Sequence, residues 1–399
     1  MYITSRLHAA LTAATEDQLV FDLGGIEDRY ESLLREFPGI SIRFAMKACP
    51  VGEVLSCLAR KGAGFDAASP GEVAQALRAG APAGRIHYGN TIKSDRNIAE
   101  AYRLGVRDFA TDSVEDVKAI AAQAPGARVF CRLATDGDGA LWGLTRKFGC
   151  SPAEVPLVLE TARAEGLTPS GISLHVGSQQ MTARAWAGAF DRMAGVMKAL
   201  DARGIQIDHV NLGGGLPALG YLDLCGRPLA PPLTTMFAVI RQGMRRLGAI
   251  SRARLDFLME PGRHLVADHG AVRAHVSRLS TRRMPSGERQ HWLYLSCGKF
   301  NGLYETDALQ YPLVFPSHLG GEYVHAVVAG PTCDSDDVFN RGRGLVQVPR
   351  DVASGDPVWI LASGAYSASY TTQGFNGFSP LPCTWIHREP QHVLGGRSR

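Results

Sequence analysis

Three side chains that can do covalent or acid–base chemistry stand at the ends of short apolar runs in this sequence. Lys47 lies near the end of SIRFAMKA, His175 follows GISL, and Glu260 follows LDFLM. A fourth run, HVNL, ends in the glycines of residues 213–215. A partly desolvated lysine has a lowered pKa and can form a Schiff base with an aldehyde. Consecutive glycines let backbone N–H groups approach the oxygens of a phosphate.

Each of these features has a simpler interpretation when it is taken alone. A strand-end lysine often reaches solvent, a buried histidine is often a hydrogen-bonded core residue, and a glycine run is often a tight turn. Their combination is more specific. A lysine for an aldehyde, glycines with Arg263 for a phosphate, a flat ring for stacking and an acid for a pyridine nitrogen are what pyridoxal 5'-phosphate (PLP) requires. We therefore predict PLP as the cofactor.

The elements that would position these residues recur regularly along the chain. Eight short apolar runs alternate with stretches of helical period, at residues 41–48, 62–69, 85–90, 107–113, 128–134, 171–178, 209–215 and 255–262. This alternation predicts an α/β protein with a TIM-like (β/α)8 barrel. The alternative is an open doubly wound sheet, which usually stops nearer six strands. In a barrel, chemistry belongs to the carboxyl ends of the strands, where the residues above stand.

The second half of the chain changes in character near residue 270. Segments such as HWLYLSCGKF and DPVWILASGAY are rich in strand-forming residues, with turn residues between them. We expect a barrel domain over residues 36–268 and a mostly antiparallel C-terminal β domain over residues 269–399. The N-terminal segment, residues 1–35, is expected to contribute to the β domain through a strand at residues 18–23.

Composition excludes several other classes of protein. Hydrophobic residues make up 45% of the 399 positions and charged residues 20%, as in globular proteins. The net charge of +4 gives little reason to expect nucleic-acid partners, and no apolar run approaches the roughly 20 residues of a membrane span. The N-terminus lacks the pattern of an export signal. The eight cysteines form no CxxC pair and no zinc-ligand spacing is present, so we expect no metal site and a cytoplasmic location.

Ten segments in order resemble the ornithine/lysine/diaminopimelate decarboxylase family of PLP enzymes, which has the alanine-racemase-like fold type III. The resemblance is strongest to the ornithine/lysine branch. The segments are FAMKACP, GAGFDAASPGEV, RIHYGNTIKS, FATDS, LHVGSQ, NLGGGLP, MEPGRHLVA, GKFNGLYET, GPTCDSDDVF and GAYSASYTTQGFNGF.

The resemblance implies a role for each matching residue. Lys47 matches the Schiff-base lysine, His175 the histidine stacked on the cofactor ring, and Glu260 the acid at the pyridine nitrogen. Cys333 and Asp334 match a pair that the family delivers across a homodimer interface: the thiol reprotonates the product carbon and the carboxylate binds the distal amine of the substrate. Phe375 lies in FNGF, which resembles an interface segment of the ornithine branch. The remaining matches form the cofactor pocket: Asp66 and Arg132, and around the phosphate Ser178, Gly213, Gly214, Gly215, Gly262, Arg263 and Tyr366.

Two departures bear on the substrate. Ser296 and Cys297 stand where relatives usually carry an aspartate at one of the two positions, and Cys49-Pro50 stands where relatives usually have an asparagine before the proline. The resemblance thus implies α-decarboxylation of L-ornithine or L-lysine. A specialised diamino acid, a siderophore-type conjugate or a carrier-bound amino acid is an alternative, and a non-catalytic regulatory homologue is a second. Diaminopimelate decarboxylase and a racemase are less favoured, because of FNGF and because of Glu260, respectively.

Overall fold

The computed structural model describes residues 3–143 and 147–388, and within them eight parallel strands close into a barrel. Its strands, in chain order, are β2 (Ser41–Ala45), β3 (Gly64–Ala67), β4 (Ile86–Tyr88), β5 (Asp108–Thr111), β6 (Arg128–Arg132), β8 (Thr168–Ser173), β10 (His209–Asn211) and β11 (Asp256–Met259). Each strand overlaps one of the eight predicted runs, and β11 closes the barrel by pairing with β2. The predicted (β/α)8 barrel is therefore confirmed.

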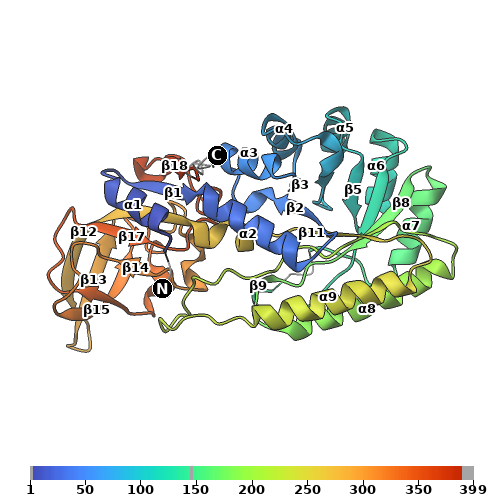
Figure 1. Ribbon diagram of the computed structural model, residues 1–399. Coiled ribbons are helices and arrows are strands. Elements are labelled where there is room, and N and C mark those ends of the chain that lie inside the picture. The colour runs from blue at the N-terminus through green and yellow to red at the C-terminus, as the bar shows by residue number, and fades with distance from the viewer. Residues whose placement is uncertain (1–2, 144–146, 389–399) are drawn as a thin grey trace, which may run out of the picture.

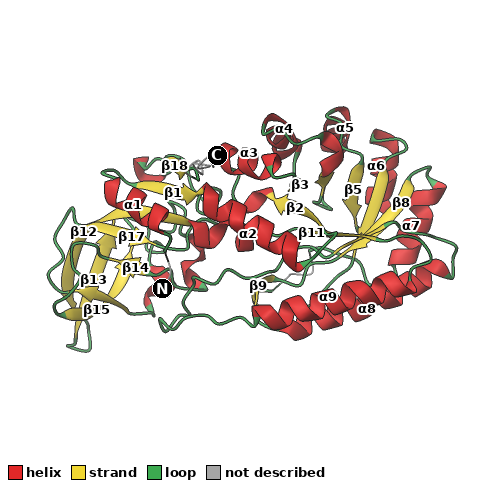
Figure 2. Cartoon of the chain, in the orientation of Figure 1, coloured by secondary structure: helices red, strands yellow, loops and turns green. Residues whose placement is uncertain are grey.

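Helices lie around the outside of this barrel (Figure 2). They are α2 (Leu23–Glu36), α3 (Gly52–Arg60), α4 (Pro70–Arg78), α5 (Asp95–Arg103), α6 (Val114–Gln123), α7 (Val155–Ala164), α8 (Ala183–Asp201), α9 (Leu233–Ile250) and the short α10 (Arg263–Val266). Ser69, Ser94 and Ser113 begin α4, α5 and α6, since each hydroxyl accepts a backbone N–H of the first turn at 3.2 Å. In the described part of the chain, no helix is long and apolar enough to span a membrane.

The second domain is a mixed sheet that lies beside the barrel in Figure 1. Its strands are β1 (Gln18–Asp22), β12 (Gly270–Arg283), β13 (Arg289–Leu295), β14 (Leu313–Val314), β15 (Tyr323–Ala329), β16 (Val346–Pro349), β17 (Pro357–Ile360) and β18 (Cys383–Ile386). The pairs β13–β15 and β1–β18 are parallel and the other pairs are antiparallel. β1 pairs with β12, and the helix α1 (Ser5–Ala13) contacts both strands. The N-terminal segment therefore lies in the sheet of the β domain.

Two hydrogen bonds join the β domain to the carboxyl end of β2. The backbone N–H of Tyr366 donates to the carbonyl of Ala48 at 2.6 Å, and the Ser369 hydroxyl donates to the carbonyl of Lys47 at 2.8 Å. A small two-stranded sheet of β7 (Ala140–Trp142) and β9 (Ser178–Gln180) lies at the same end of the barrel. The carboxyl ends of the barrel strands thus meet the β domain.

Candidate active site

Lys47 lies just past the end of β2, in a 3-10 turn of Met46–Ala48, and its ammonium faces Asp66 on β3. The distance from Lys47 Nζ to Asp66 Oδ2 is 3.6 Å. Desolvation alone would lower the pKa of Lys47, but the nearby negative charges, Asp66 foremost, outweigh it and raise that pKa above its ordinary value. The expectation of a lowered pKa at Lys47 is therefore wrong, because it did not include this aspartate.

Asp66 also belongs to a buried cluster with His87 and Glu260. His87, the middle residue of β4, places Nε2 2.8 Å from Glu260 Oε1 and 3.3 Å from Asp66 Oδ1. Asn211 Nδ2 donates to the same Glu260 oxygen at 2.5 Å. Burial opposes a charge on His87, but the two carboxylates outweigh it and raise its pKa. Burial likewise opposes a charge on Asp66, yet Lys47 and His87 hold its pKa well below the usual range.

These three side chains are close enough to bind a cation. The ligand atoms of Asp66, His87 and Glu260 all lie within 4.8 Å of one another. The raised pKa of His87 favours a proton on its ring, and this charge together with that of Lys47 offsets the two carboxylates. The sequence analysis expected no metal ligands and did not single out His87.

His175 follows β8 and presents a neutral ring at the barrel mouth. Its Nδ1 accepts the backbone N–H of Gly177 at 3.0 Å, so this nitrogen carries no proton. Burial, with the charges of Arg132 and Lys47, lowers the pKa of His175 to about 3. A flat uncharged imidazole suits stacking on an aromatic ring. Arg132, at the end of β6, lies with its guanidinium 4.9 Å from the ring centre of Phe148.

The glycine run after β10 lies against the loops of its neighbours. Gly213 has φ +63°, and a Cβ there would lie 2.0 Å from the carbonyl oxygen of Leu174. A Cβ on Gly214 would lie 2.9 Å from His175 Nε2, and one on Gly215 2.6 Å from the carbonyl oxygen of Gly177. Only glycine fits these positions, so backbone rather than side chains lines this part of the mouth. Gly262 is similar, since its Cβ would lie 2.7 Å from that of Ala48.

Arg263, expected to bind phosphate, is already paired with an acid of the β domain. It is 4% exposed, and its Nη1 and Nη2 contact the two oxygens of Glu305 at 2.5 and 2.6 Å. It also donates to the Ser178 hydroxyl at 3.2 Å, and its guanidinium lies 4.6 Å from the Tyr366 ring centre. The structure thus brings Ser178, Arg263 and Tyr366 together, and Glu305 is a partner that the sequence analysis missed.

Cys333, Asp334 and Phe375 lie apart from this cluster, on exposed turns of the β domain. The Cys333 backbone N–H donates to Asn376 Oδ1 at 2.8 Å, which joins the turn of residues 331–337 to the FNGF segment. Phe375 is 36% exposed and its ring centre lies 4.8 Å from that of Phe300. In the described part of the chain, neither Cys333 nor Asp334 makes a hydrogen bond or ion pair with Lys47, His175 or Glu260.

Asp337 is a buried anchor of that turn. Its carboxylate accepts the backbone N–H of Lys299 at 2.8 Å, the N–H of Thr332 at 3.0 Å and the Thr332 hydroxyl at 2.7 Å. It is 1% exposed, and sequence reasoning had no means to distinguish it from its solvated neighbour Asp336. Thr332 is only five residues away, but Lys299 is 38 residues away, so the full set of contacts appears only in the folded turn.

Ser296 and Cys297, the first of the two departures from the family pattern, have other partners than a carboxylate would have. Cys297 is fully buried, and burial raises the pKa of its thiol, so it stays neutral. The Ser296 hydroxyl accepts the backbone N–H of His275 at 2.9 Å. Lys299, two residues on, is 3% exposed and pairs with Asp307 at 2.9 Å and Asp336 at 3.1 Å. The positive charge of Lys299 thus offsets part of the negative charge of Asp307 and Asp336 in this part of the β domain.

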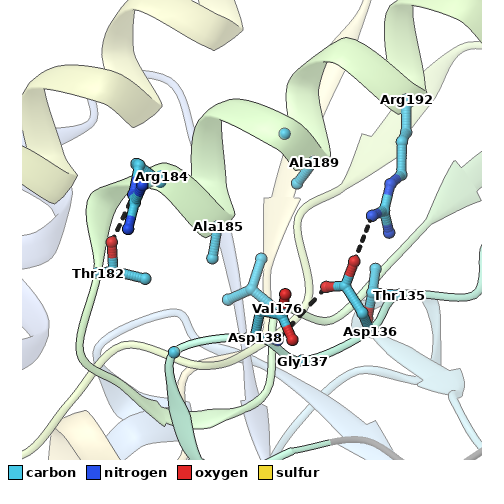
Figure 3. A pocket seen from close by; sticks show the side chains of 12 residues that line it. Thr135, Asp136, Gly137, Asp138, Val176, Thr182, Arg184, Ala185, Ala189 and Arg192 are labelled. Carbon is cyan, nitrogen blue, oxygen red and sulfur yellow. Dashed lines mark hydrogen bonds and ion pairs between the residues drawn. The ribbon is translucent and has the colours of Figure 1, made fainter.

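A pocket of about 490 Å³ lies beside the barrel mouth, between the loop after β6 and the start of α8 (Figure 3). Two of its charged groups, Arg192 and Asp136, form an ion pair at 2.6 Å. None of the residues predicted for the site lines it. The chemistry lies instead around Lys47, Asp66 and Glu260.

The residues at the mouth fit PLP. Lys47 offers an amine, the glycine loop and Ser178 offer a cradle that a Cβ would fill, and Glu260 offers a carboxylate oriented by Asn211. This fold and this donor set define a PLP enzyme of the barrel type. Residues 23–267 match the family described as "Pyridoxal-dependent decarboxylase, pyridoxal binding domain", and the chain belongs to that family.

Individual proteins that are similar to this chain in sequence are amino-acid decarboxylases. The lysine/ornithine decarboxylase of Selenomonas ruminantium is 30% identical over 382 residues, covering 94% of this chain and 91% of the relative. The ornithine decarboxylase of Saccharomyces cerevisiae is 29% identical over 383 residues, covering 90% of this chain and 78% of the relative.

Solved structures show the same likeness. Lysine decarboxylase from Selenomonas ruminantium superposes with a TM-score of 0.84 at 29% identity, covering 98% of each chain. Lysine/ornithine decarboxylase from Vibrio vulnificus, complexed with putrescine, has a TM-score of 0.82 at 27% identity and covers 96% of this chain and 99% of its own. The predictions of the family, of PLP as cofactor and of an amino-acid decarboxylase are confirmed.

Proposed function

We propose that this enzyme removes the α-carboxyl group of L-ornithine or L-lysine and releases the corresponding diamine, as in polyamine biosynthesis. The observation that carries the proposal is that Cys333 and Asp334 stand together on one exposed turn, which Asp337 holds in place. A thiol can supply a proton to carbon, and a carboxylate can bind the distal ammonium of a basic amino acid. Relatives named for lysine and ornithine support the same substrate class.

In this proposal each residue at the mouth has one task. Lys47 Nζ would hold the cofactor through its aldehyde. The backbone of the glycine loop, Ser178, Gly262, Arg263 and Tyr366 hold its phosphate. Bound PLP supplies an electron sink for the pair left on the α-carbon when CO2 departs. Glu260 would hold a proton at the ring nitrogen, the neutral ring of His175 would stack on the cofactor ring, and Asp66 and Arg132 would line the pocket.

The proposal includes a homodimer with shared active sites. Cys333 and Asp334 do not contact Lys47 within one chain, so a second copy must bring them to the mouth. Exposed aromatic rings lie next to the site: Tyr370 is 48% exposed and stacks 5.2 Å from Tyr366, and Tyr304 is 62% exposed and lies 5.3 Å from Tyr370. Such a patch is typical of a protein interface. A cytoplasmic location fits, because a catalytic thiol stays reduced there.

A specialised substrate is a second candidate, and the neutral Cys297 favours it. Lys299 further offsets the charges of Asp307 and Asp336. A site with a single free carboxylate, Asp334, would bind the distal ammonium of ornithine or lysine less tightly than a site with two carboxylates. A diamino acid of another length, a conjugate or a carrier-bound amino acid would then be preferred.

Release of CO2 by the PLP-loaded protein tests both candidates. The panel is L-ornithine, L-lysine, L-arginine, L-2,4-diaminobutyrate and meso-diaminopimelate. Rapid release from ornithine or lysine, with KM raised at least about tenfold by Asp334→Asn, supports the first candidate. No release across the panel from a protein that binds PLP at Lys47 contradicts it and favours a conjugated substrate. A protein that binds no PLP would instead be the non-catalytic homologue.

A further inference from the structure

His87 is the one side chain that contacts both carboxylates of the cluster among the described residues. Its Nε2 lies 2.8 Å from Glu260 Oε1 and 3.3 Å from Asp66 Oδ1, and the residue is 1% exposed. Burying an imidazole between two acids is costly unless it carries a proton that both acids share. Its place in the middle of β4 is therefore a feature of the site and not of the apolar core.

The same ring faces the opposite end of the barrel. His87 lines a pocket of about 380 Å³ together with residues that begin five of the barrel strands, namely Ser41, Asp108, Arg128, His209 and Asp256. Lys47 and the glycine loop lie at the other, carboxyl ends. His87 thus separates the mouth that holds the cofactor residues from a polar pocket at the amino ends of the strands.

The charges around His87 come from four elements. Asp66 on β3 and Glu260 after β11 favour its charged form, whereas Arg43 on β2 opposes it. Arg43 lies 3.8 Å from Asp108 on β5, which offsets part of its charge. The ring of Phe130 on β6 is also a neighbour, with its centre 5.2 Å from that of His87, but it carries no charge. The two acids are the groups in direct contact, so they dominate.

We infer that His87 is a positioning residue of the cofactor site, in which its imidazolium binds Glu260 and Asp66 and orients Glu260 from the side away from the cofactor. His87 and Asn211 both contact the Oε1 atom of Glu260. The other oxygen, Oε2, makes no hydrogen bond within the described chain and is free to face the ring nitrogen of the cofactor. The positive charge of His87 also lowers the proton affinity of the groups that it faces.

This inference rests on the proposed role of Glu260, and absorption spectra of the PLP-loaded protein between pH 6 and 10 test it. His87→Gln keeps a donor and removes the charge. Loss of a positive charge near the cofactor raises the pKa of groups around it, so we expect the midpoint of the pH-dependent absorption change to rise by about one unit. Glu260→Gln should also move that midpoint.

His209→Gln is the matched control. His209 is also buried, lines the same pocket and lies 5.5 Å from the ring centre of the same Phe130, but it pairs with Asp208 at 3.0 Å. A general effect of replacing a buried histidine would appear in both variants. We expect the His209→Gln spectrum to follow the wild type.

The outcomes separate the inference from the proposal on which it rests. A shift in Glu260→Gln with none in His87→Gln overturns the role of His87 alone. No shift in either variant overturns the proposed role of Glu260 as well. Equal shifts in His87→Gln and His209→Gln also overturn the inference. If His87→Gln does not fold, nitrogen NMR of the wild-type imidazole decides: the imidazolium should persist at pH 7.5, and a neutral ring at pH 6.5 contradicts it.

Discussion

Charged groups inside the barrel mouth lie in opposite pairs, and these pairs decide how each residue titrates. Lys47 was predicted from its position near the end of an apolar run, but its pKa follows from Asp66, which comes from the next strand. His87 and Glu305 were missed for the same reason, because a histidine in RIHY and an acid in LYET carry no signal until their partners are brought near. Residue identity led to the candidate reacting groups, and contacts distant in sequence determine how these groups titrate.

Replacing Asp66 with asparagine should make the stability of the protein less dependent on pH. The pKa of Asp66 is lower in the folded protein than in the unfolded chain. Its carboxylate therefore stabilises the native state at pH values above the unfolded-state pKa, and this stabilisation is lost as the pH falls through the folded-state pKa. The free energy of unfolding of Asp66→Asn should therefore lie below that of the wild type at pH 7, with the difference shrinking in acid. Urea unfolding of both proteins at pH 7 and pH 3 measures it, because the unfolded pKa of an aspartate is about 3.9.

The same variant should lower the pKa of Lys47, because the carboxylate that raises it is gone. The pH dependence of the reaction of Lys47 with PLP reports this pKa, and its midpoint should fall by about one unit. Asp95→Asn, an exposed acid at the start of α5, is the control and should leave the midpoint in place. An unchanged midpoint in Asp66→Asn would mean that the ion pair does not control the lysine.

Among the elements, the barrel strands were predictable and the small loop strands were not. Each barrel strand is an apolar run that ends in glycine or a polar residue, which is a local signal. The sheet of β7 and β9 pairs two three-residue segments about 40 positions apart, and its sequence has no strand period. The site depends on such elements, because β9 carries Ser178. The sequence therefore predicted the strand ends but not the loops that fold over them.

The glycine loop after β10 should not tolerate a methyl group. Gly213→Ala adds a Cβ that would lie 2.0 Å from the Leu174 carbonyl, at φ +63°. Gly204 has nearly the same φ, +64°, with nothing within 4 Å of its Cβ position. Gly204→Ala therefore measures the cost of placing alanine at a positive φ without a steric clash. We expect Gly213→Ala to lose about 1–3 kcal/mol more stability than Gly204→Ala and to bind PLP more weakly. Calorimetry and PLP titration measure both, and equal losses would contradict the clash.

The turn that carries Cys333 and Asp334 should depend on Asp337. Asp337→Ala leaves the buried N–H groups of Lys299 and Thr332 without an acceptor, which costs about 1–3 kcal/mol and frees the turn. Decarboxylase activity should fall with it. Asp336→Ala, which removes an exposed partner of Lys299, should cost less than about 1 kcal/mol. Similar losses in the two variants would show that Asp337 is no special anchor.

At the scale of the whole molecule, neither domain holds all of the residues proposed for the site. Lys47, His175 and Glu260 lie in the barrel, whereas Tyr366 and the turn of Cys333 lie in the β domain. The barrel was predicted from the alternation of apolar runs and helical stretches, and the second domain from its segments rich in strand-forming residues. The contact between the two domains, through Ala48 and Arg263, could not be predicted, because no pattern in the sequence indicates which surfaces meet.

The proposed shared site predicts complementation between two inactive variants. Lys47→Ala and Cys333→Ala homodimers should both be inactive. Random exchange of subunits in a 1:1 mixture should restore about a quarter of the wild-type activity, since half the dimers are mixed and each has one intact site. Rates of CO2 release before and after mixing under mild dissociating conditions measure this. No recovery, with exchange shown by mass spectrometry, would contradict a site built from two chains.

The ion pair of Arg263 and Glu305 has a consequence for how the protein is made. Arg263 is translated with the last strand of the barrel, but Glu305 and Tyr366 leave the ribosome only later. A nascent barrel therefore carries Arg263 without its acid until the β domain folds against it. We expect cofactor capture during synthesis to wait for the second domain, and a truncated chain that ends at the barrel to be more open to proteolysis than the whole protein.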